Sequence, residues 1–434
     1  MPGYLNECFH LYGPNFQLNI AGTAVVFVSD HDSLDTFYRN KDGSLTNDIL
    51  ITASPPRLLG GVKAPDSAYI IETSLIPIIV KGNMEPSLCE IGEAFNRELC
   101  NQFAQLLVDQ SPSRPQPLRQ LITYTLFHSI VPAVFGSDFP LSIYDDLMAL
   151  DISTYHLFHS IPLFSNSVPH ARLRVRGAVL DFMRSWKDST TPHADYAISE
   201  HGNEVLHKLF ALDLTDEDRA GLLQVYIWGL ITNVFRMTYW LIAHLVCDRA
   251  DYMRMQEEID AGVAHEFPDR PSLLSAHPRA VNSTRFALLD SGMKETGRLY
   301  FYPFSRRIAT ADVEFRSASG PFMVSKGSQV IAYNTGAHHN PDNFEDPKRF
   351  LLDRFVGGKN ARNLYLWARG SHICPGRHMA IYYLKMFTIL LFQQYELAAA
   401  EGEAQPVRLP EGNPWSAGMP LPRKDVLVTL RKRV

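Results

Sequence analysis

Two short strand-like stretches open the chain. Residues 16–20 alternate between apolar and polar side chains, and a second apolar run follows a Gly-Thr pair. A period of two residues indicates a strand that is buried on one face, so this pattern predicts a β-hairpin. Ser29 or Asp30 could then cap a helix that is expected at 31–39.

A helical repeat covers most of the remaining chain. It is strong over 88–108, and helical signals continue to about residue 299. The segment 313–333 returns to a strand-like pattern, a strongly apolar helix is expected at 377–394, and a last strand is expected near 426–430. The pattern therefore predicts a mainly α fold with a small β portion from both chain ends.

The longest apolar stretch lies between Gly221 and Val246, and Thr215 can cap the helix that contains it. This stretch also carries Arg236, and an arginine near the centre of a membrane span costs about 2.5–3.5 kcal/mol on insertion scales. We therefore expect a long helix that is buried inside a folded domain and not a membrane span.

The composition is that of an ordinary globular protein. Of the 434 residues, 46% are hydrophobic and 20% are charged, and the formal net charge is -5. This balance does not favour nucleic acid as a partner. The five cysteines are odd in number and lack CxxC spacing, which argues against a disulfide framework and a zinc site. No linker or repeat divides the chain, so residues 1–434 are expected to form one domain.

One cysteine lies in a segment rich in glycine. Gly370 precedes Cys374, Gly376 follows it, and a helix is expected directly afterwards. Glycines permit close backbone approach to a flat ligand, and the N-terminus of a helix favours a thiolate over a thiol. His372 could meet an anionic edge of such a ligand. The alternative for a lone cysteine is a buried structural role.

The segment around Cys374 resembles the haem-binding signature of the cytochrome P450 superfamily, and its His-Ile-Cys-Pro-Gly-Arg-His form looks most like fungal members. The resemblance implies that Cys374 is the thiolate ligand of haem b (iron protoporphyrin IX), in a loop shaped by Trp367, Gly370 and Gly376. Trp367 replaces the usual phenylalanine but still shields the sulfur, and His372 replaces the usual arginine but can donate to a haem propionate. The implied fold is a triangular helical prism crossed by a long I helix.

Three further elements resemble the family in its own order and spacing. Glu295 and Arg298 lie in a segment like the family's K helix, and Arg354 lies in one like the meander before the cysteine loop. The resemblance implies a buried Glu295–Arg298–Arg354 network that fixes this loop, whereas an exposed Glu–Arg pair would be worth little. By the same match, Arg307 meets one haem propionate and His372 the other. The alternative for Arg307 is an ordinary surface charge.

The long apolar helix resembles the family's I helix, which usually carries an acid followed by threonine over the distal face of the haem. Aligned on Trp228 and Trp240, this chain places Thr232 at the acid position and Asn233 at the threonine position. The pattern resembles the branch of sterol 7α/12α-hydroxylases and prostacyclin synthase, which contains both monooxygenases and isomerases. Thr232 and Asn233 are the catalytic candidates. Asparagine can hydrogen-bond but cannot titrate, and helix packing is its alternative role.

The resemblance also implies the walls of a substrate pocket. They come from the I helix, from the segment after the K helix and from the turn at 418–420, and the region 59–71 is expected to form part of a lid. The predicted lining residues are Trp228, Gly229, Thr232, Asn233, Tyr300, Phe301, Tyr302, Pro303, Phe304 and Met419. These mostly aromatic and apolar walls suit a lipophilic molecule such as a terpenoid, steroid or alkaloid. Each residue could equally be plain core.

Basic residues cluster in sequence around the cysteine loop, namely Lys359, Arg362, Arg369, Arg377 and Lys385. A basic proximal face would steer the acidic flavodomain of NADPH-cytochrome P450 reductase, and a solvated charge run is the alternative. By the resemblance, we expect the family's N-terminal membrane anchor to be missing from this sequence. We expect that it was truncated from a monomeric enzyme of the endoplasmic reticulum membrane, on its cytoplasmic face.

Three functions stay open at this point. The first is a monooxygenase, in which the thiolate promotes cleavage of the O–O bond of dioxygen with electrons from the reductase. The second is an isomerase, dehydratase or oxidative rearrangement enzyme, which is motivated by Thr232 and Asn233 replacing the acid–threonine pair. The third is a non-catalytic haem or lipid binder, against which the intact cysteine loop and charge network argue.

Overall fold

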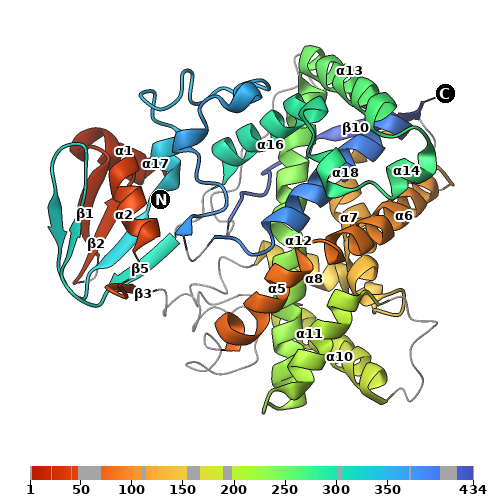
Figure 1. The fold of residues 1–434 in the computed structure, drawn as a ribbon, viewed down its shortest axis with the longest axis horizontal. Helices are drawn as coiled ribbons and strands as arrows, with labels where there is room; N and C mark the ends of the chain where they lie inside the picture. The colour runs from red at the N-terminus through yellow and green to blue at the C-terminus, as the bar shows by residue number, and fades with distance from the viewer. Residues whose placement is uncertain are drawn as a thin grey trace.

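The computed structural model describes residues 2–20, 22–40, 42–46, 70–108, 114–153, 167–188, 198–301, 305–370, 373–400 and 418–433. Most of these residues are helical and the rest contribute to three small sheets, as the sequence predicts. The largest sheet has five strands. Figure 1 shows this sheet with α1 (Pro2–Tyr12) and α2 (His31–Arg39) at one side of the molecule. The helices fill the other side.

The larger sheet joins the start of the chain to the segment after residue 300. Its order is β1 (Asn15–Ile20), β2 (Thr23–Val28), β8 (Gln329–Ala332), β5 (Ser305–Ala309) and β3 (Leu45–Thr46). The predicted hairpin is confirmed, because β1 and β2 pair antiparallel with Ile20 opposite Thr23. The cap of α2 is Asp30, whose carboxylate accepts from the backbone N–H groups of Asp32 and Ser33.

Two smaller sheets complete the β portion. One contains β4 (Gln116–Pro117), β10 (Leu427–Lys432) and β9 (Tyr395–Ala399), so the expected final strand is present. The other pairs β6 (Val313–Phe315) with β7 (Phe322–Val324). Gly320 and Gly327 lie in turns beside these strands, with φ of 110° and 86°, where other residues would be strained.

The helical part is built around α12 (Asp216–Cys247), which runs through its middle in Figure 1. Thr215 caps it by accepting from the backbone N–H of Asp218. By length and composition α12 could cross a membrane, but 78% of its most apolar window is buried inside the fold, as expected of a core helix.

The other helices surround α12. They are α5 (Ile76–Gly82), which continues a π-helical turn (Ile71–Leu75), α6 (Ser87–Val108), α7 (Leu118–Phe135), α8 (Tyr144–Ile152), α10 (Ser167–Asp188), α11 (Glu200–Ala211), α13 (Arg249–Glu266), α14 (Arg270–Leu274), α15 (Pro278–Val281), α16 (Ala287–Tyr300), α17 (Asn334–His338) and α18 (Arg377–Gln394). The bounds of α18 match the predicted helix. Residues of α7, α10, α16 and α18 all contact α12, and this packing positions the candidate site.

Candidate functional site

The loop that carries Cys374 ends where α18 begins. The backbone N–H of Cys374 donates to the carbonyl of Trp367 at 2.8 Å, and Gly376 is the N-cap of α18. Gly370 has φ of 68°, and a Cβ there would lie 2.2 Å from the carbonyl oxygen of Tyr38. Only glycine therefore fits at this position. The loop is held between α18 and α2, and Cys374 lies at its end.

The surroundings of the Cys374 thiol act on its pKa in both directions. Burial raises the pKa, whereas a hydrogen bond from the Gly376 backbone and the charge of Arg377 lower it. Because the net shift is upward, these two groups alone do not hold a thiolate. A bound metal cation would displace the thiol proton. Cys374 therefore offers a soft sulfur donor that would become anionic on binding a metal cation.

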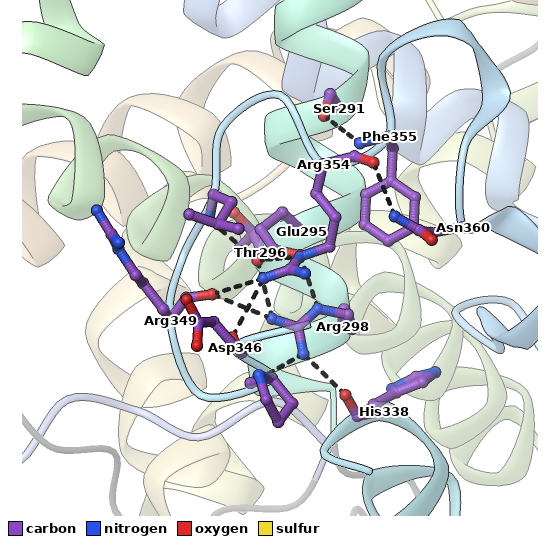
Figure 2. A network of polar contacts seen from close by, with 12 residues as sticks. Ser291, Glu295, Thr296, Arg298, His338, Asp346, Arg349, Arg354, Phe355 and Asn360 are labelled. Atoms are coloured by element: carbon purple, nitrogen blue, oxygen red, sulfur yellow. Dashed lines mark hydrogen bonds and ion pairs between the residues drawn. The ribbon is translucent and has the colours of Figure 1, made fainter. Parts of the chain in front are cut away.

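Glu295 of α16 forms the centre of a buried charge network (Figure 2). Its carboxylate accepts from Arg298 at 2.7 and 2.8 Å and from Arg354 at 3.0 and 3.1 Å. The two arginines also donate to backbone carbonyls of residues 338, 345, 346, 347 and 349. All three side chains are at most 3% exposed. The network therefore ties α16 to the segment that leads into the cysteine loop.

Arg307 of β5 is a buried cation that is only 2% exposed. It donates to the carbonyl of Phe37, and its guanidinium carbon lies 4.6 Å from the centre of the Phe37 ring. Burial lowers its pKa, and none of the described carboxylates lies within ion-pair distance. A buried, uncompensated arginine is costly unless an anion joins it. This fits a haem propionate. The second predicted propionate partner, His372, lies outside the described residues.

A cavity separates α12 from the cysteine loop. Gly229 and Asn233 are exposed although most neighbours on α12 are buried, and a Cβ at Gly229 would meet no atom within 4 Å. The cavity is lined by Asn233, Met237, Phe301, Leu366, Trp367 and Met419, among others. The structure therefore brings Asn233, Phe301 and Met419 together with Trp367, on the side of α12 that a haem above Cys374 would face.

Other predicted pocket residues lie elsewhere. Thr232 is buried at 2% exposure and does not line the cavity. Trp228 donates through its indole N–H to Asp151, on the flank of α12. Tyr300 stacks on Trp240 with 4.1 Å between ring centres, and its hydroxyl lies 2.9 Å from Nε2 of His244. Tyr302, Pro303, Phe304 and most of the expected lid at 59–71 lie outside the described residues.

Only some residues of the basic cluster lie on the surface. Lys359 and Arg362 are exposed, while Arg369 and Arg377 are half-buried. Lys385 is 1% exposed and forms an ion pair with Asp290 at 3.2 Å, so its assignment to a partner face is wrong. It lies inside a helix with apolar residues on both sides in sequence, and this pattern could have indicated a buried position.

Two polar residues beside the cavity were not predicted as part of the site. Arg236 was noticed only as a charge inside an apolar helix, and Asp151 gave no sequence signal. They form an ion pair of 2.7 Å that is almost completely buried. A charged residue in an otherwise apolar helix needs a buried partner, so Arg236 was the available signal.

Comparison with known proteins identifies the class. The family model described as cytochrome P450 matches residues 189–428, and the chain belongs to this family. Among similar proteins are 25-hydroxycholesterol 7-alpha-hydroxylase of Rattus norvegicus (26% identity, 39% of this chain and 44% of the relative) and cytochrome P450 7A1 of Sus scrofa (24%, 44% and 41%). Another is 7-alpha-hydroxycholest-4-en-3-one 12-alpha-hydroxylase of Oryctolagus cuniculus (25%, 47% and 43%).

These relatives agree with the sterol-hydroxylase branch that the α12 sequence indicates. The chain spans less than half the length of each of these three curated relatives. Membership of the family implies a haem cofactor, and the cysteine thiol, the open face of α12 and the buried Arg307 fit such a group. The resemblance to fungal members stays a prediction.

Proposed function

We propose that this protein is a haem-thiolate monooxygenase that oxidises a lipophilic substrate with dioxygen. The proposal depends on one observation: the cysteine loop and the open face of α12 line the same cavity, through Trp367 and Asn233. Cys374 would bind the iron, Trp367 would cover the sulfur, and Arg307 and His372 would neutralise the propionates. When bound, haem b supplies the activation of dioxygen.

The residues of this chain would orient the substrate and exclude water. Met237, Phe301 and Met419 make the cavity wall apolar, which suits a terpenoid, steroid or alkaloid. Asn233 would hydrogen-bond an oxygen of the ligand or a water without exchanging a proton itself. The names of the sterol hydroxylases among the relatives favour the steroid class.

Electrons would come from NADPH through NADPH-cytochrome P450 reductase. Lys359 and Arg362 are exposed beside the cysteine loop and would contribute to docking of an acidic flavodomain. A monomer at the cytoplasmic face of the endoplasmic reticulum membrane stays the expected setting, as the family resemblance implies.

A second candidate function is isomerisation, dehydration or oxidative rearrangement of an oxygenated substrate. It is favoured by the burial of Thr232 and by the amide of Asn233, which leave α12 without a titratable pair at the cavity. Turnover of substrate by purified protein without NADPH and dioxygen would support isomerisation or dehydration and reject the monooxygenase, whereas an oxidative rearrangement would need dioxygen and electrons as the monooxygenase does.

The first test is the spectrum of the reduced protein with carbon monoxide. We expect the red-shifted Soret band of thiolate-ligated haem in the wild-type protein and its loss in Cys374→Ser. The band should remain in Cys89→Ser, which changes a cysteine of α6 that is distant from Cys374 in the sequence. If the band is absent from the wild-type protein, or survives in Cys374→Ser, the proposed function is rejected.

A further inference from the structure

A buried ion pair joins α8 to α12 beside the cavity. Nη2 of Arg236 donates to Oδ1 of Asp151 at 2.7 Å, and the two side chains are 2% and 6% exposed. The same carboxylate oxygen accepts from the indole N–H of Trp228 at 3.2 Å. Trp228 and Arg236 lie two helical turns apart, so Asp151 spans the flank of α12 on which Thr232 is buried.

The same arginine reaches the turn at 418–420. Its Nη1 donates to the carbonyl of Met419 at 2.9 Å, and Trp240 donates to the carbonyl of Pro420 at 2.7 Å. Two consecutive carbonyls of this turn are therefore bound by side chains of α12. Among the described residues, Gly418, Met419 and Pro420 belong to no helix or strand.

The turn is also in direct contact with the catalytic candidate. Gly418 has φ of 71°, and a Cβ there would lie 3.0 Å from Oδ1 of Asn233 and 3.9 Å from Nη1 of Arg236. Met419 and Asn233 both line the cavity. A displacement of the turn would therefore change both the cavity wall and the space beside the Asn233 amide.

The chemistry of the pair favours holding over proton transfer. Arginine does not release its proton in proteins, and the indole N–H of Trp228 does not titrate. The planar guanidinium holds its two Nη nitrogens in a fixed geometry, with Nη2 donating to Asp151 and Nη1 donating to Met419. Because the guanidinium is rigid, a shift of the Asp151 carboxylate would also shift the Met419 carbonyl that the same arginine binds.

We propose that Asp151, acting through Arg236, positions the Met419 turn above Asn233 and so sets which ligands fit the distal cavity. This inference deepens the proposed function and rests on it. Asp151 and Arg236 are positioning residues, because neither lines the cavity between α12 and the cysteine loop. We name the set of Asp151, Arg236 and the Met419 carbonyl the turn clamp.

The test compares Arg236→Met, which breaks the turn clamp, with Lys385→Met, which removes another buried cation whose ion-pair partner, Asp290, is 34% exposed. Spectral titrations use imidazole as a small haem ligand and 4-phenylimidazole as a large one. In Arg236→Met we expect the imidazole affinity to stay within about twofold and the 4-phenylimidazole affinity to change by about tenfold. In Lys385→Met both stay within about twofold. If Arg236→Met and Lys385→Met change the ratio of the 4-phenylimidazole affinity to the imidazole affinity equally, the proposal is overturned.

A second readout does not depend on haem chemistry. Amide hydrogen exchange at 418–426 should be faster in Arg236→Met than in the wild type, and unchanged in Lys385→Met. Equal exchange in all three proteins would contradict the turn clamp even if the carbon monoxide test rejects the proposed function. Conversely, faster exchange at 418–426 in Arg236→Met, together with the expected carbon monoxide spectrum of the wild-type protein, supports both the turn clamp and the proposed function.

Two conservative variants protect the test against misfolding. Asp151→Asn keeps an acceptor oxygen for Trp228 and Arg236 but removes the charge, so the change in the affinity ratio should have the same sign and a smaller size. Arg236→Lys keeps the charge but loses the fork, and should behave more like Arg236→Met than like the wild type. If Arg236→Lys keeps the wild-type ratio of the two ligand affinities, the guanidinium geometry does not position the turn.

Discussion

At the scale of single residues, burial holds two histidines in their neutral form. It lowers the pKa of His244 to about 3 and that of His338 to about 3. His244 lies 2.9 Å from the hydroxyl of Tyr300, and His338 accepts from the backbone N–H of Tyr365. In the unfolded chain a histidine takes up a proton near pH 6.5. The unfolded state therefore binds more protons than the folded state between about pH 6.5 and about pH 3.

Stability should consequently fall as the pH is lowered through this window. Above about pH 6.5 both states are neutral and this contribution is absent. Below about pH 6.5, each of these histidines should lower the free energy of unfolding by up to about 1.4 kcal/mol per pH unit. We expect His244→Gln to show a shallower loss of the free energy of unfolding than the wild type between about pH 7 and about pH 5, measured by urea denaturation. If the free energy of unfolding falls equally in His244→Gln and the wild type over this pH range, this account is contradicted.

The charge network around Glu295 makes a second prediction about single residues. Glu295→Gln leaves Arg298 and Arg354 buried without their counter-charge, and should lower the free energy of unfolding by about 3–5 kcal/mol. Arg431→Met breaks an ion pair with Glu396 in which the arginine side chain is 79% exposed, and should cost less than about 1 kcal/mol. Urea denaturation measures both. Similar losses would mean that burial does not decide the strength of these pairs.

At the scale of elements, the sequence predicts what depends on local periodicity. The hairpin, α2, α12 and α18 lie where they were expected, and α2 and α12 begin with side-chain caps from Asp30 and Thr215. The turn clamp could not be predicted, because 85 residues separate Asp151 from Arg236 and nothing local pairs them. For Lys385 the apolar neighbours in α18 could have indicated burial, and only its partner Asp290, which lies on another helix, could not be predicted locally.

Two helical glycines make a prediction for the elements that contain them. A Cβ at Gly229 of α12 would meet open space, whereas one at Gly297 of α16 would lie 2.6 Å from Cδ2 of Leu366. Gly229→Ala should raise the free energy of unfolding by about 0.5–1 kcal/mol through helix propensity. Gly297→Ala should lower it by about 1–3 kcal/mol through overpacking. Thermal and urea unfolding would measure both, and stabilisation by Gly297→Ala would contradict this packing.

At the scale of the whole molecule, the candidate site depends on contact between the sheet side and the helical side. Gly370 of the cysteine loop lies against the carbonyl of Tyr38, and Arg307 of the sheet lies over Phe37. Both contacts are made with α2. The sheet side of the molecule therefore determines where the loop that carries Cys374 lies.

Gly370→Ala tests this dependence. The added Cβ would lie 2.2 Å from a backbone oxygen at φ of 68°, so the loop must move. We expect lower haem occupancy per purified protein with near-normal far-UV circular dichroism. Gly376→Ala is the matched control, since a Cβ there meets no atom within 4 Å. Equal haem occupancy in both variants would contradict a loop held by α2.

The position of Tyr38 has a consequence for how the protein is made. The family match covers residues 189–428, yet the support of the cysteine loop belongs to residues 31–39, which are synthesised far earlier. During translation this support leaves the ribosome long before the segment that rests on it. A haem held by Cys374 in this loop would therefore bind only after the segment around residue 374 has been synthesised and has met α2.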